Sequence, residues 1–443
     1  MLDRLYSAYL GSHTVTTDSR AITPGCIFFA FKGANFDGNA FAPKALEQGA
    51  AMCVVSNEWR EESGEWKDDD RIIGVDDVLK TLQELAREHR RHLTIPVVGI
   101  TGTNGKTTTK ELVHAVLSKR YRTSATKGNF NNHLGVPLTL LGIPEGTEIA
   151  IVEMGANHPG EIEQLCGIAD PDCGLITNVG RAHLEGFGSF EGVVQTKTEL
   201  YRWLAGKHSL VFVNADNEIL MQKSEGLSRF TYGRTETANV RGTLVTDTQS
   251  LSHSATQSPY LHFYFEVQDS VYTVQSHLLG AYNFDNCMAA VAVGLHFGVE
   301  PWDIKEAIEE YIPSNQRSEY KETPRGNRLY LDCYNANPSS MAAAISSFAT
   351  MNGTMAIIGG MHELGSAERK EHESVVEQLA ACGLDRVLLV GPEWEPLPHP
   401  DNMLLFNDTD SVHTYLQEHP VSGATILIKG SNTNRLWTLE ELL

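Results

Sequence analysis

The stretch Val97-Val-Gly-Ile-Thr101-Gly-Thr-Asn-Gly-Lys106-Thr-Thr108 decides the fold of this chain. Its first four residues form a β-branched apolar run typical of a buried strand, and a glycine-rich turn follows. After Lys106, apolar residues recur at helical spacing at positions 112, 113, 116 and 117. A strand, a glycine turn and a helix in this order predict a polyphosphate-binding loop, because backbone N–H groups and a helix N-terminus then face the phosphate oxygens.

The predicted loop is a variant of the usual phosphate-binding pattern. That pattern has glycine five residues before Gly105-Lys106, where this chain has Ile100. The alternative is a strand-to-helix turn with an incidental lysine, and the flanking strand and helix argue against it. We therefore expect the loop to bind nucleotide phosphate through seven residues: Gly102, Thr103, Asn104, Gly105, Lys106, Thr107 and Thr108.

Other segments predict an α/β protein of three domains, since 443 residues exceed the size of a single hydrophobic core. Strand-like runs in the first 93 residues lie at 26–31 and 51–55, before a helix at 78–92. Runs at 149–152, 174–177 and 210–213 alternate with helices, as in a parallel sheet, and residues 239–276 read as an antiparallel extension. Runs at 329–331, 355–358, 387–390 and 425–428 predict a doubly wound last domain. The expected domains are 1–93, 94–312 and 313–443.

Composition and charge narrow the class of partner. The net charge is −21 and no Lys/Arg-rich tract is present, which argues against nucleic acid or an anionic membrane surface. No run approaches the roughly 18 apolar residues of a membrane span. Seven cysteines without CxxC spacing fit a reducing compartment, so we expect a cytoplasmic protein. A monomer is expected separately, since nothing in the sequence fixes the oligomeric state. The charged stretch 58–71 is expected to be a solvated loop.

Two polar residues follow predicted strands of the central domain. Glu153 ends the run Ile151-Val-Glu153, and His183 lies in a glycine-bearing loop after residue 177. Taken singly, either residue could be structural or merely exposed. Because open α/β sheets bind ligands at the carboxyl ends of their strands, the combination of Lys106, Thr107, Glu153 and His183 favours a nucleotide and Mg²⁺ site.

The loop at residues 101–108 resembles the ATP loop of the Mur ligase family, which folylpolyglutamate synthetases share. The likeness runs from about residue 17 to 431. Further segments resemble the family member that adds D-alanyl-D-alanine to UDP-N-acetylmuramoyl-tripeptide in bacterial cell-wall synthesis: Gly128-Asn-Phe-Asn-Asn-His-Leu-Gly-Val-Pro137, Glu153-Met-Gly-Ala-Asn-His-Pro-Gly-Glu161, Ala182-His-Leu-Glu-Gly-Phe-Gly188, Asp332-Cys-Tyr-Asn-Ala-Asn-Pro-Ser339 and Gly360-Met-His-Glu-Leu-Gly365.

The resemblance implies an ATP-dependent, Mg²⁺-requiring peptide ligase with a central ATPase domain and a UDP-binding first domain. Lys106 and Thr107 would act on the β- and γ-phosphates and one Mg²⁺, which Glu153 also holds. His183 would ligate a second Mg²⁺, and Lys197 would be carbamylated into a further ligand. Without the resemblance, Lys197 would be read as an ordinary surface lysine.

The resemblance also implies contacts to nucleotide and substrates. Asn283, Arg317 and Asp332 would approach ATP, although Tyr282 and Asn315-Gln316 depart from the family pattern. Ser19 and Arg20 would bind the UDP moiety. Further substrate-binding residues are expected at Asn129, Asn132, Asn157, His158, Asn335 and Asn337.

Four other functions fit the sequence less well. A ligase that adds a diamino acid would carry an Asp-Asn-Pro-Arg motif, and a GTPase would carry Asn-Lys-x-Asp; neither occurs here. A folate polyglutamating enzyme fits the segments at 128–137 and 182–188 poorly. A non-catalytic paralogue is disfavoured because all the motif residues are present.

Overall fold

The computed structural model describes residues 1–33, 36–245, 259–314, 316–351 and 353–443. The chain divides into two compact units. The first comprises residues 1–100, 121–156 and 160–174, and the second comprises 101–120, 157–159 and 175–443. The division passes through strands β5 (Val97–Thr101) and β8 (Cys173–Ile176), so each unit is described by itself.

The first unit begins with a four-stranded sheet in the order β1-β2-β3-β4, all of whose neighbouring strands are parallel. Its apolar residues form one core with those of α2. The segment 58–71 was predicted wrongly as a loop, because α3 and the 3-10 helix η2 occupy most of it. The elements are α1 (Leu2–Ser12), β1 (Val15–Thr16), β2 (Ile27–Phe29), η1 (Gly38–Phe41), α2 (Ala42–Glu47), β3 (Met52–Ser56), α3 (Asn57–Glu62), η2 (Gly64–Asp68), β4 (Ile72–Val75) and α4 (Val78–His92).

The first unit also holds part of the central sheet. Strand β7 (Ile149–Glu153) pairs in parallel with β5 and with β6 (Thr123–Ala125). Every residue of β5 and β7 is buried, which explains why both read in the sequence as continuous apolar runs. Helices α6 (Gly135–Leu141) and α7 (Glu161–Ala169) follow β6 and β7 in the chain.

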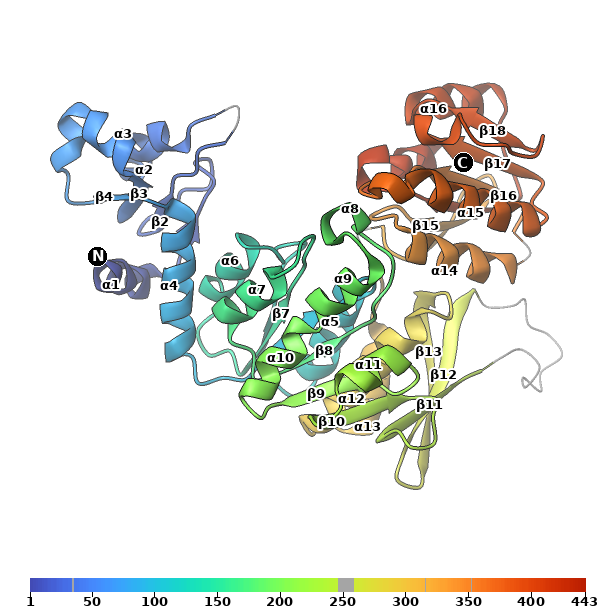
Figure 1. Ribbon diagram of the computed structural model, residues 1–443, viewed down its shortest axis with the longest axis horizontal. Helices are drawn as coiled ribbons and strands as arrows, with labels where there is room; N and C mark the ends of the chain where they lie inside the picture. The colour runs from blue at the N-terminus through green and yellow to red at the C-terminus, as the bar shows by residue number, and fades with distance from the viewer. Residues whose placement is uncertain (34–35, 246–258, 315, 352) are drawn as a thin grey trace. The chain divides into compact units, whose positions relative to one another are not determined.

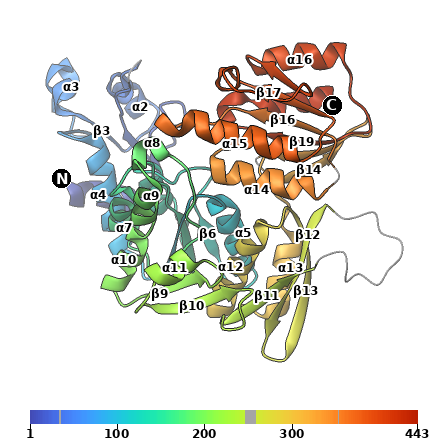
Figure 2. The same ribbon diagram turned by 45° about the vertical axis from the view of Figure 1, so that its right-hand side comes forward.

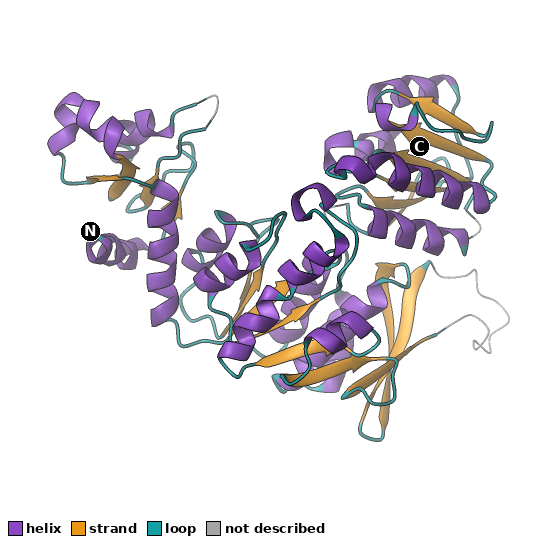
Figure 3. Ribbon diagram, in the orientation of Figure 1, coloured by secondary structure: helices purple, strands orange, loops and turns teal. Residues whose placement is uncertain are grey.

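The second unit contains the helix that follows the predicted phosphate loop and the predicted sheet extension. Strand β10 pairs in parallel with β9 and β11. Strand β12 pairs antiparallel with β11 and β13, as expected for residues 239–276. Positions 246–258 lie outside the described residues. Figure 3 shows the long β12–β13 hairpin. The elements are α5 (Lys106–Ser118), α8 (Leu184–Phe187), α9 (Phe190–Lys197), α10 (Glu199–Gly206), β9 (Leu210–Asn214), α11 (Glu218–Lys223), β10 (Ser228–Gly233), β11 (Val240–Leu244), β12 (Tyr260–Val267), β13 (Ser270–Leu279), α12 (Asn283–His296) and α13 (Pro301–Glu310).

Residues from 319 onward build a six-stranded sheet in the order β14-β15-β19-β16-β17-β18, parallel except for β14. Helices α14 and α15 lie on one face and α16 on the other, which confirms the doubly wound prediction (Figures 1 and 2). The elements are β14 (Glu319–Glu322), β15 (Arg328–Asp332), α14 (Pro338–Ala349), β16 (Met355–Gly359), η4 (Gly365–Ala367), α15 (Glu368–Ala381), β17 (Arg386–Val390), η5 (Pro392–Trp394), β18 (Met403–Phe406), α16 (Thr409–Glu418), β19 (Thr425–Lys429), η6 (Asn432–Asn434) and η7 (Leu436–Leu442).

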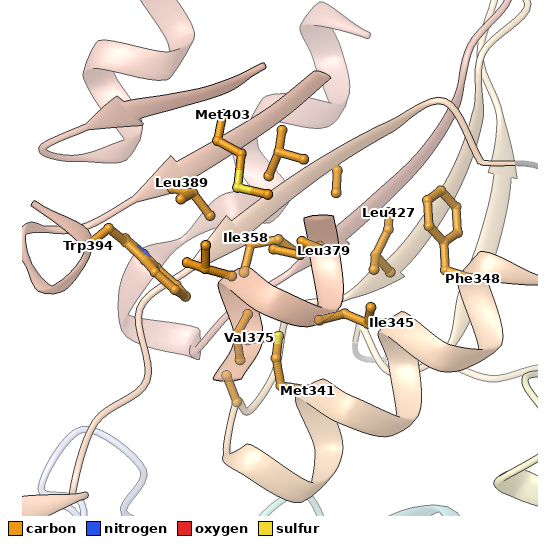
Figure 4. Packing of buried hydrophobic residues seen from close by; sticks show 14 of the residues in the cluster. Met341, Ile345, Phe348, Ile358, Val375, Leu379, Leu389, Trp394, Met403 and Leu427 are labelled. Carbon is orange, nitrogen blue, oxygen red and sulfur yellow. The ribbon is translucent and has the colours of Figure 1, made fainter. Parts of the chain in front are cut away.

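Two apolar cores cover the faces of this sheet because successive side chains of a strand point to opposite sides. In β16, Ile358 joins the core under α14 and α15, whereas Ile357 joins the core under α16 and η7. Figure 4 shows the first of these cores, where Trp394 and Phe348 lie at opposite ends. Within the described ranges, the helices are too short or too polar to span a lipid bilayer.

Candidate active site

The predicted phosphate loop connects β5 to α5 and depends on two glycines. Gly102 has φ 144° and Gly105 has φ 77°, which are conformations that other residues rarely adopt. A Cβ on Gly102 would lie 2.0 Å from Thr177 Oγ1, and one on Gly105 would lie 2.4 Å from Asn286 Oδ1. Gly105 occupies the N-cap position of α5 and has no side chain to cap the first N–H groups, which can therefore receive an anion.

The segment after β8 fixes the shape of the loop. Thr103 N donates to Asn178 O (3.0 Å), and Asn104 N donates to Asn178 Oδ1 (3.0 Å). In return, Thr177 Oγ1 and Asn178 Nδ2 donate to Asn104 O at 2.6 and 3.0 Å. The loop is thus held by hydrogen bonds of its own fold, and such preorganisation is what a binding site for a charged group requires.

Lys106 extends over the loop that precedes it. Its ammonium donates to the carbonyls of Gly102 (2.8 Å) and Thr103 (2.9 Å). Thr107 and Thr108 lie in the first turn of α5 and are mostly buried. The charge of Lys106 therefore sits at the N-terminus of α5, where a phosphate would be held.

Glu153 is the last residue of β7 and is 1 % exposed. Asn131 Nδ2 donates to Glu153 Oε1 (2.8 Å), and Asn131 O accepts from Gly155 N (2.7 Å). Glu153 N donates to Thr126 Oγ1 (3.0 Å). The carboxylate is buried with an oriented amide beside it, and Asn131 was not predicted from the sequence.

The two asparagines predicted on either side of Asn131 have different surroundings. Asn132 Oδ1 accepts from the N–H groups of Leu134 (3.1 Å) and Gly135 (2.9 Å), so this side chain closes the turn before α6. Asn129 is exposed. Among these three asparagines, the structure places Asn131 against the predicted metal-binding carboxylate.

His183 precedes α8 and has φ 50°. Its Nδ1 is hydrogen-bonded to a carboxylate oxygen of Glu363. Burial lowers the pKa of His183, and the charges of Lys106 and Lys197 lower it further, against the opposing effect of Glu363. The imidazole is therefore kept neutral near pH 7, which is the form that binds metal ions.

Lys197 is the last residue of α9 and is 2 % exposed, so it is not the surface lysine that its sequence context alone indicates. Its Nζ lies 5.3 Å from the centroid of the Phe187 ring. Both Lys197 and Lys106 act electrostatically on His183, which brings these three predicted site residues into one neighbourhood. Carbamylation of Lys197 stays a prediction.

The predicted adenine-side residue Asn283 is 1 % exposed and already hydrogen-bonded. Its Nδ2 donates to Leu279 O (2.7 Å) and Ser318 Oγ (3.3 Å), and its Oδ1 accepts from Asn286 Nδ2 (2.8 Å). Contact with a base would require these bonds to rearrange. The hydroxyl of Tyr282 is hydrogen-bonded to the same Ser318 Oγ (2.9 Å).

A small pocket adjoins this segment. It combines residues before α12 with residues of β15 and α14, and its lining includes Gly280, Tyr282, Ser318, Tyr330, Asp332 and Phe348. Asp332, which was predicted to approach ATP, and Tyr282, which precedes the predicted adenine-side residue Asn283, therefore line the same pocket.

Asp332 forms an ion pair that was not predicted. Lys429 Nζ lies 2.6 Å from Asp332 Oδ2, and Lys429 is fully buried. The two residues face each other in the register of β15 and β19. Lys429 also donates to Asn335 O (3.2 Å). The predicted nucleotide residue Arg317 makes a separate contact, with its guanidinium carbon 3.6 Å from the centroid of the Tyr334 ring.

The remaining predicted substrate residues are mainly exposed. Arg20 pairs with Asp18 at 2.8 Å on the surface, an arrangement of small energetic value. Residues 34–35 of the predicted UDP-binding first domain lie outside the described residues. Asn157 and His158 are exposed. The backbone carbonyl of Asn157 lies close to Gly186, since a Cβ added to Gly186 would come 2.2 Å from this oxygen.

Comparison with known proteins gives consistent matches along the chain. Residues 12–90, 100–294 and 316–432 match the families described as Mur ligase family, catalytic domain; Mur ligase middle domain; and Mur ligase, glutamate ligase domain. UDP-N-acetylmuramoyl-tripeptide–D-alanyl-D-alanine ligase of Bacillus subtilis is 36 % identical over 382 residues, covering 86 % of this chain and 80 % of the relative. The chain belongs to the Mur ligase family.

Other relatives of this Mur ligase cover nearly its full length. The protein of the same name from Escherichia coli is 34 % identical, covering 97 % of this chain and 93 % of the relative. The crystal structure of MurF ligase from Thermotoga maritima in complex with ADP has a TM-score of 0.83 at 28 % identity, covering 97 % of this chain and 96 % of that one. The predicted three-domain α/β architecture is thereby confirmed, whereas the domain boundaries stay predictions.

The side chains that could coordinate Mg²⁺ in this Mur ligase include few carboxylates and imidazoles. Among the residues that the structure describes, no three His, Cys, Asp or Glu side chains gather into a metal-binding group. The predicted set contains only two residues of these types, Glu153 and His183. Hydroxyl, carbamate and phosphate oxygens would have to complete the coordination sphere, and hard oxygen donors are those that Mg²⁺ prefers.

Proposed function

We propose that this Mur ligase joins D-alanyl-D-alanine to UDP-N-acetylmuramoyl-tripeptide at the expense of ATP, giving the pentapeptide precursor of peptidoglycan. The observation that carries the proposal is the match to ligases of this name in Bacillus subtilis and Escherichia coli, over 86 % and 97 % of the chain. The phosphate loop, formed from Gly102 to Thr108, supplies the chemical basis for ATP use.

ATP would bind with its phosphates at the N-terminus of α5. Gly102 and Gly105 allow backbone N–H groups to approach the oxygens, and Lys106 would exchange its two loop carbonyls for the β- and γ-phosphates. The ADP complex of the MurF ligase from Thermotoga maritima supports nucleotide binding in this fold. Asn283, Arg317 and Asp332 are proposed to complete the nucleotide site.

Two Mg²⁺ ions are proposed to act at the reacting phosphate. Thr107 and Glu153 would hold one, and His183 and carbamylated Lys197 would hold the other. The ions supply charge neutralisation for the transferring phosphoryl group. The burial of Glu153 beside the amide of Asn131, and of Lys197 in a helix beside Phe187, fits ligands that are held in fixed orientations.

The chemistry proceeds in two steps. The terminal carboxylate of the tripeptide attacks the γ-phosphorus of ATP, ADP leaves, and an acyl phosphate forms. The amine of D-alanyl-D-alanine then attacks the acyl carbon, phosphate leaves, and the amine proton passes to solvent. Lys106 stabilises the negative charge that accumulates on the phosphoryl oxygens in the first step.

The other substrates are proposed to bind residues outside the loop. Ser19 and Arg20 would bind the UDP moiety, and Asn129, Asn132, Asn157 and His158 the muramoyl peptide. Asn335 and Asn337 would approach D-alanyl-D-alanine from the last of the proposed domains, 1–93, 94–312 and 313–443. A monomer in the cytoplasm is the proposed functional form.

Phosphate release from ATP tests the function. Release should require both D-alanyl-D-alanine and UDP-N-acetylmuramoyl-tripeptide, and the corresponding dipeptide nucleotide should not substitute. Lys106→Ala should lower turnover by roughly 100-fold or more, because one preorganised charge is lost. Lys370→Ala, at an exposed position on α15, is the matched control. Release that does not depend on D-alanyl-D-alanine, or near-normal turnover of Lys106→Ala, would overturn the assignment.

A further inference from the structure

The loop after β16 brings a carboxylate to His183 from a distant part of the chain. Glu363 lies in the segment Gly360-Met-His-Glu-Leu-Gly365 and is hydrogen-bonded to Nδ1 of His183. The backbone of the same residue is also engaged, because Glu185 N donates to Glu363 O (3.2 Å). Figures 1 and 2 show α8, which follows His183, beside the end of α15 that this loop enters.

The loop that carries Glu363 is anchored in the core under α14 and α15. Met361 is fully buried and Leu364 is 2 % exposed, and both belong to that core. Met361 N donates to Nε2 of the buried His372 (3.0 Å). Glu363 itself adopts φ 61°, in the left-handed region that residues other than glycine rarely occupy. The loop is therefore fixed to the core on both sides of Glu363.

The chemical consequence concerns which nitrogen of His183 carries the proton. A carboxylate only accepts hydrogen bonds, so the neutral imidazole beside it must carry its proton on Nδ1. The lone pair is then on Nε2, and the ring orientation is fixed. Histidines that bind metal ions commonly donate their second ring N–H to a carboxylate in this way.

We propose that Glu363 is a positioning residue: it selects the Nδ1–H tautomer of His183 and thereby presents Nε2 as the ligand of a divalent cation. The metal part rests on the proposed function, whereas the tautomer part rests on the observed contact. The last domain thus takes part in building the metal site, and His183 is competent only while the loop at 360–365 is seated against α8.

The tautomer is read directly by long-range ¹H–¹⁵N NMR of protein labelled in histidine, without metal or nucleotide, with the His183 signals assigned by their loss in His183→Ala. Wild type should show Nδ1–H. Glu363→Ala should move the population toward Nε2–H, whereas Glu363→Gln should retain Nδ1–H because its amide oxygen can accept. Glu373→Ala, which removes an exposed partner of Arg369, is the control and should resemble wild type.

Binding of Mn²⁺ in the presence of ADP, followed by electron paramagnetic resonance, tests the second part. Glu363→Ala should weaken Mn²⁺ binding about 10- to 100-fold, as loss of a residue that orients a ligand does. Glu363 is half exposed, so an unchanged melting temperature should accompany these effects. An unchanged tautomer in Glu363→Ala overturns the proposal. If Glu363→Ala shifts the tautomer but His183→Ala binds Mn²⁺ with wild-type affinity, the positioning role of Glu363 is supported. The metal-binding role of His183 is then overturned.

Discussion

The side-chain amides of Asn104 and Asn337 are hydrogen-bonded to each other, with Asn337 Nδ2 donating to Asn104 Oδ1 over 2.8 Å. Asn337 also caps α14, because its Oδ1 accepts from Ser340 N (2.9 Å). Asn337→Asp keeps an acceptor for the cap and for Asn104 Nδ2, which lies 3.4 Å from Asn337 Oδ1, but it cannot make the shorter bond to Asn104 Oδ1. We expect this variant to melt near the wild-type temperature and to show a several-fold higher KM for ATP, because the phosphate loop loses one support.

Asn337→Ala removes both interactions and should lower the free energy of unfolding by about 1 kcal/mol, the usual value of an N-cap. Thermal melting and steady-state kinetics on both variants separate the two roles. A KM for ATP that stays at the wild-type value in Asn337→Asp, with only the KM for D-alanyl-D-alanine raised, would show that Asn337 contacts substrate and does not support the loop.

Asn131 should be needed for activity although it was not predicted. Asn131→Ala removes the amide that orients Glu153, and turnover should fall about 10- to 100-fold, as for other residues that orient metal ligands. The Mg²⁺ concentration for half-maximal rate should rise. Asn57→Ala, which removes an exposed hydrogen bond to Asp76, is the matched control. Equal turnover of the two variants would rule out an orienting role.

Gly102 should tolerate no side chain. In Gly102→Ala, the new Cβ would meet Thr177 Oγ1 at 2.0 Å at a φ of 144°. The variant should lose about 1–3 kcal/mol of stability and most of its affinity for ATP. Gly206→Ala is the control, since no atom lies within 4 Å of its added Cβ, and it should be neutral or slightly stabilising. Urea unfolding and nucleotide titration measure both effects.

His89 should make the first unit sensitive to acid. It is buried against Tyr9, with ring centroids 4.8 Å apart, and neither ring nitrogen has a hydrogen-bond partner among the described residues. Burial, followed by the charges of His13 and His92, lowers the pKa of His89 from 6.5 to about 4. Below pH 6.5, His89 is therefore protonated in the unfolded chain but stays neutral in the folded chain. The free energy of unfolding consequently falls as the pH decreases toward 4.

His89→Phe has no proton to take up and retains the aromatic contact with Tyr9. Its melting temperature should fall less than that of wild type between pH 7 and pH 4.5, and the difference should vanish above pH 7. Parallel pH dependences for the two proteins would show that His89 does not contribute.

The strands that were predicted are those whose apolar residues leave a local mark. Val97–Thr101 and Ile149–Glu153 are buried on both faces and read as continuous runs. Strand β14 (Glu319–Glu322) was missed because a polar edge strand has no such pattern. Strand β18 (Met403–Phe406) was missed although its four apolar residues gave a signal.

The candidate site was predictable where a motif carried it and not where tertiary contacts select a residue. Lys106 follows from the loop pattern. By contrast, three asparagines at 129, 131 and 132 are equivalent in the sequence, and only the fold places Asn131 against Glu153. Glu363 contacts His183 from 180 positions further along the chain, and Lys429 contacts Asp332 from 97 positions further along. A local sequence pattern does not encode contacts at such separations.

The position of β19 has a consequence for synthesis of the protein. This strand lies between β15 and β16, although β16, β17 and β18 all precede it in the chain. While the ribosome is still translating residues before 425, β15 and β16 have no neighbour on their inner edges. Lys429 is also missing, so Asp332 lacks its ion pair. The sheet of the last domain therefore keeps two open strand edges until residues 425–429 have been synthesised and paired.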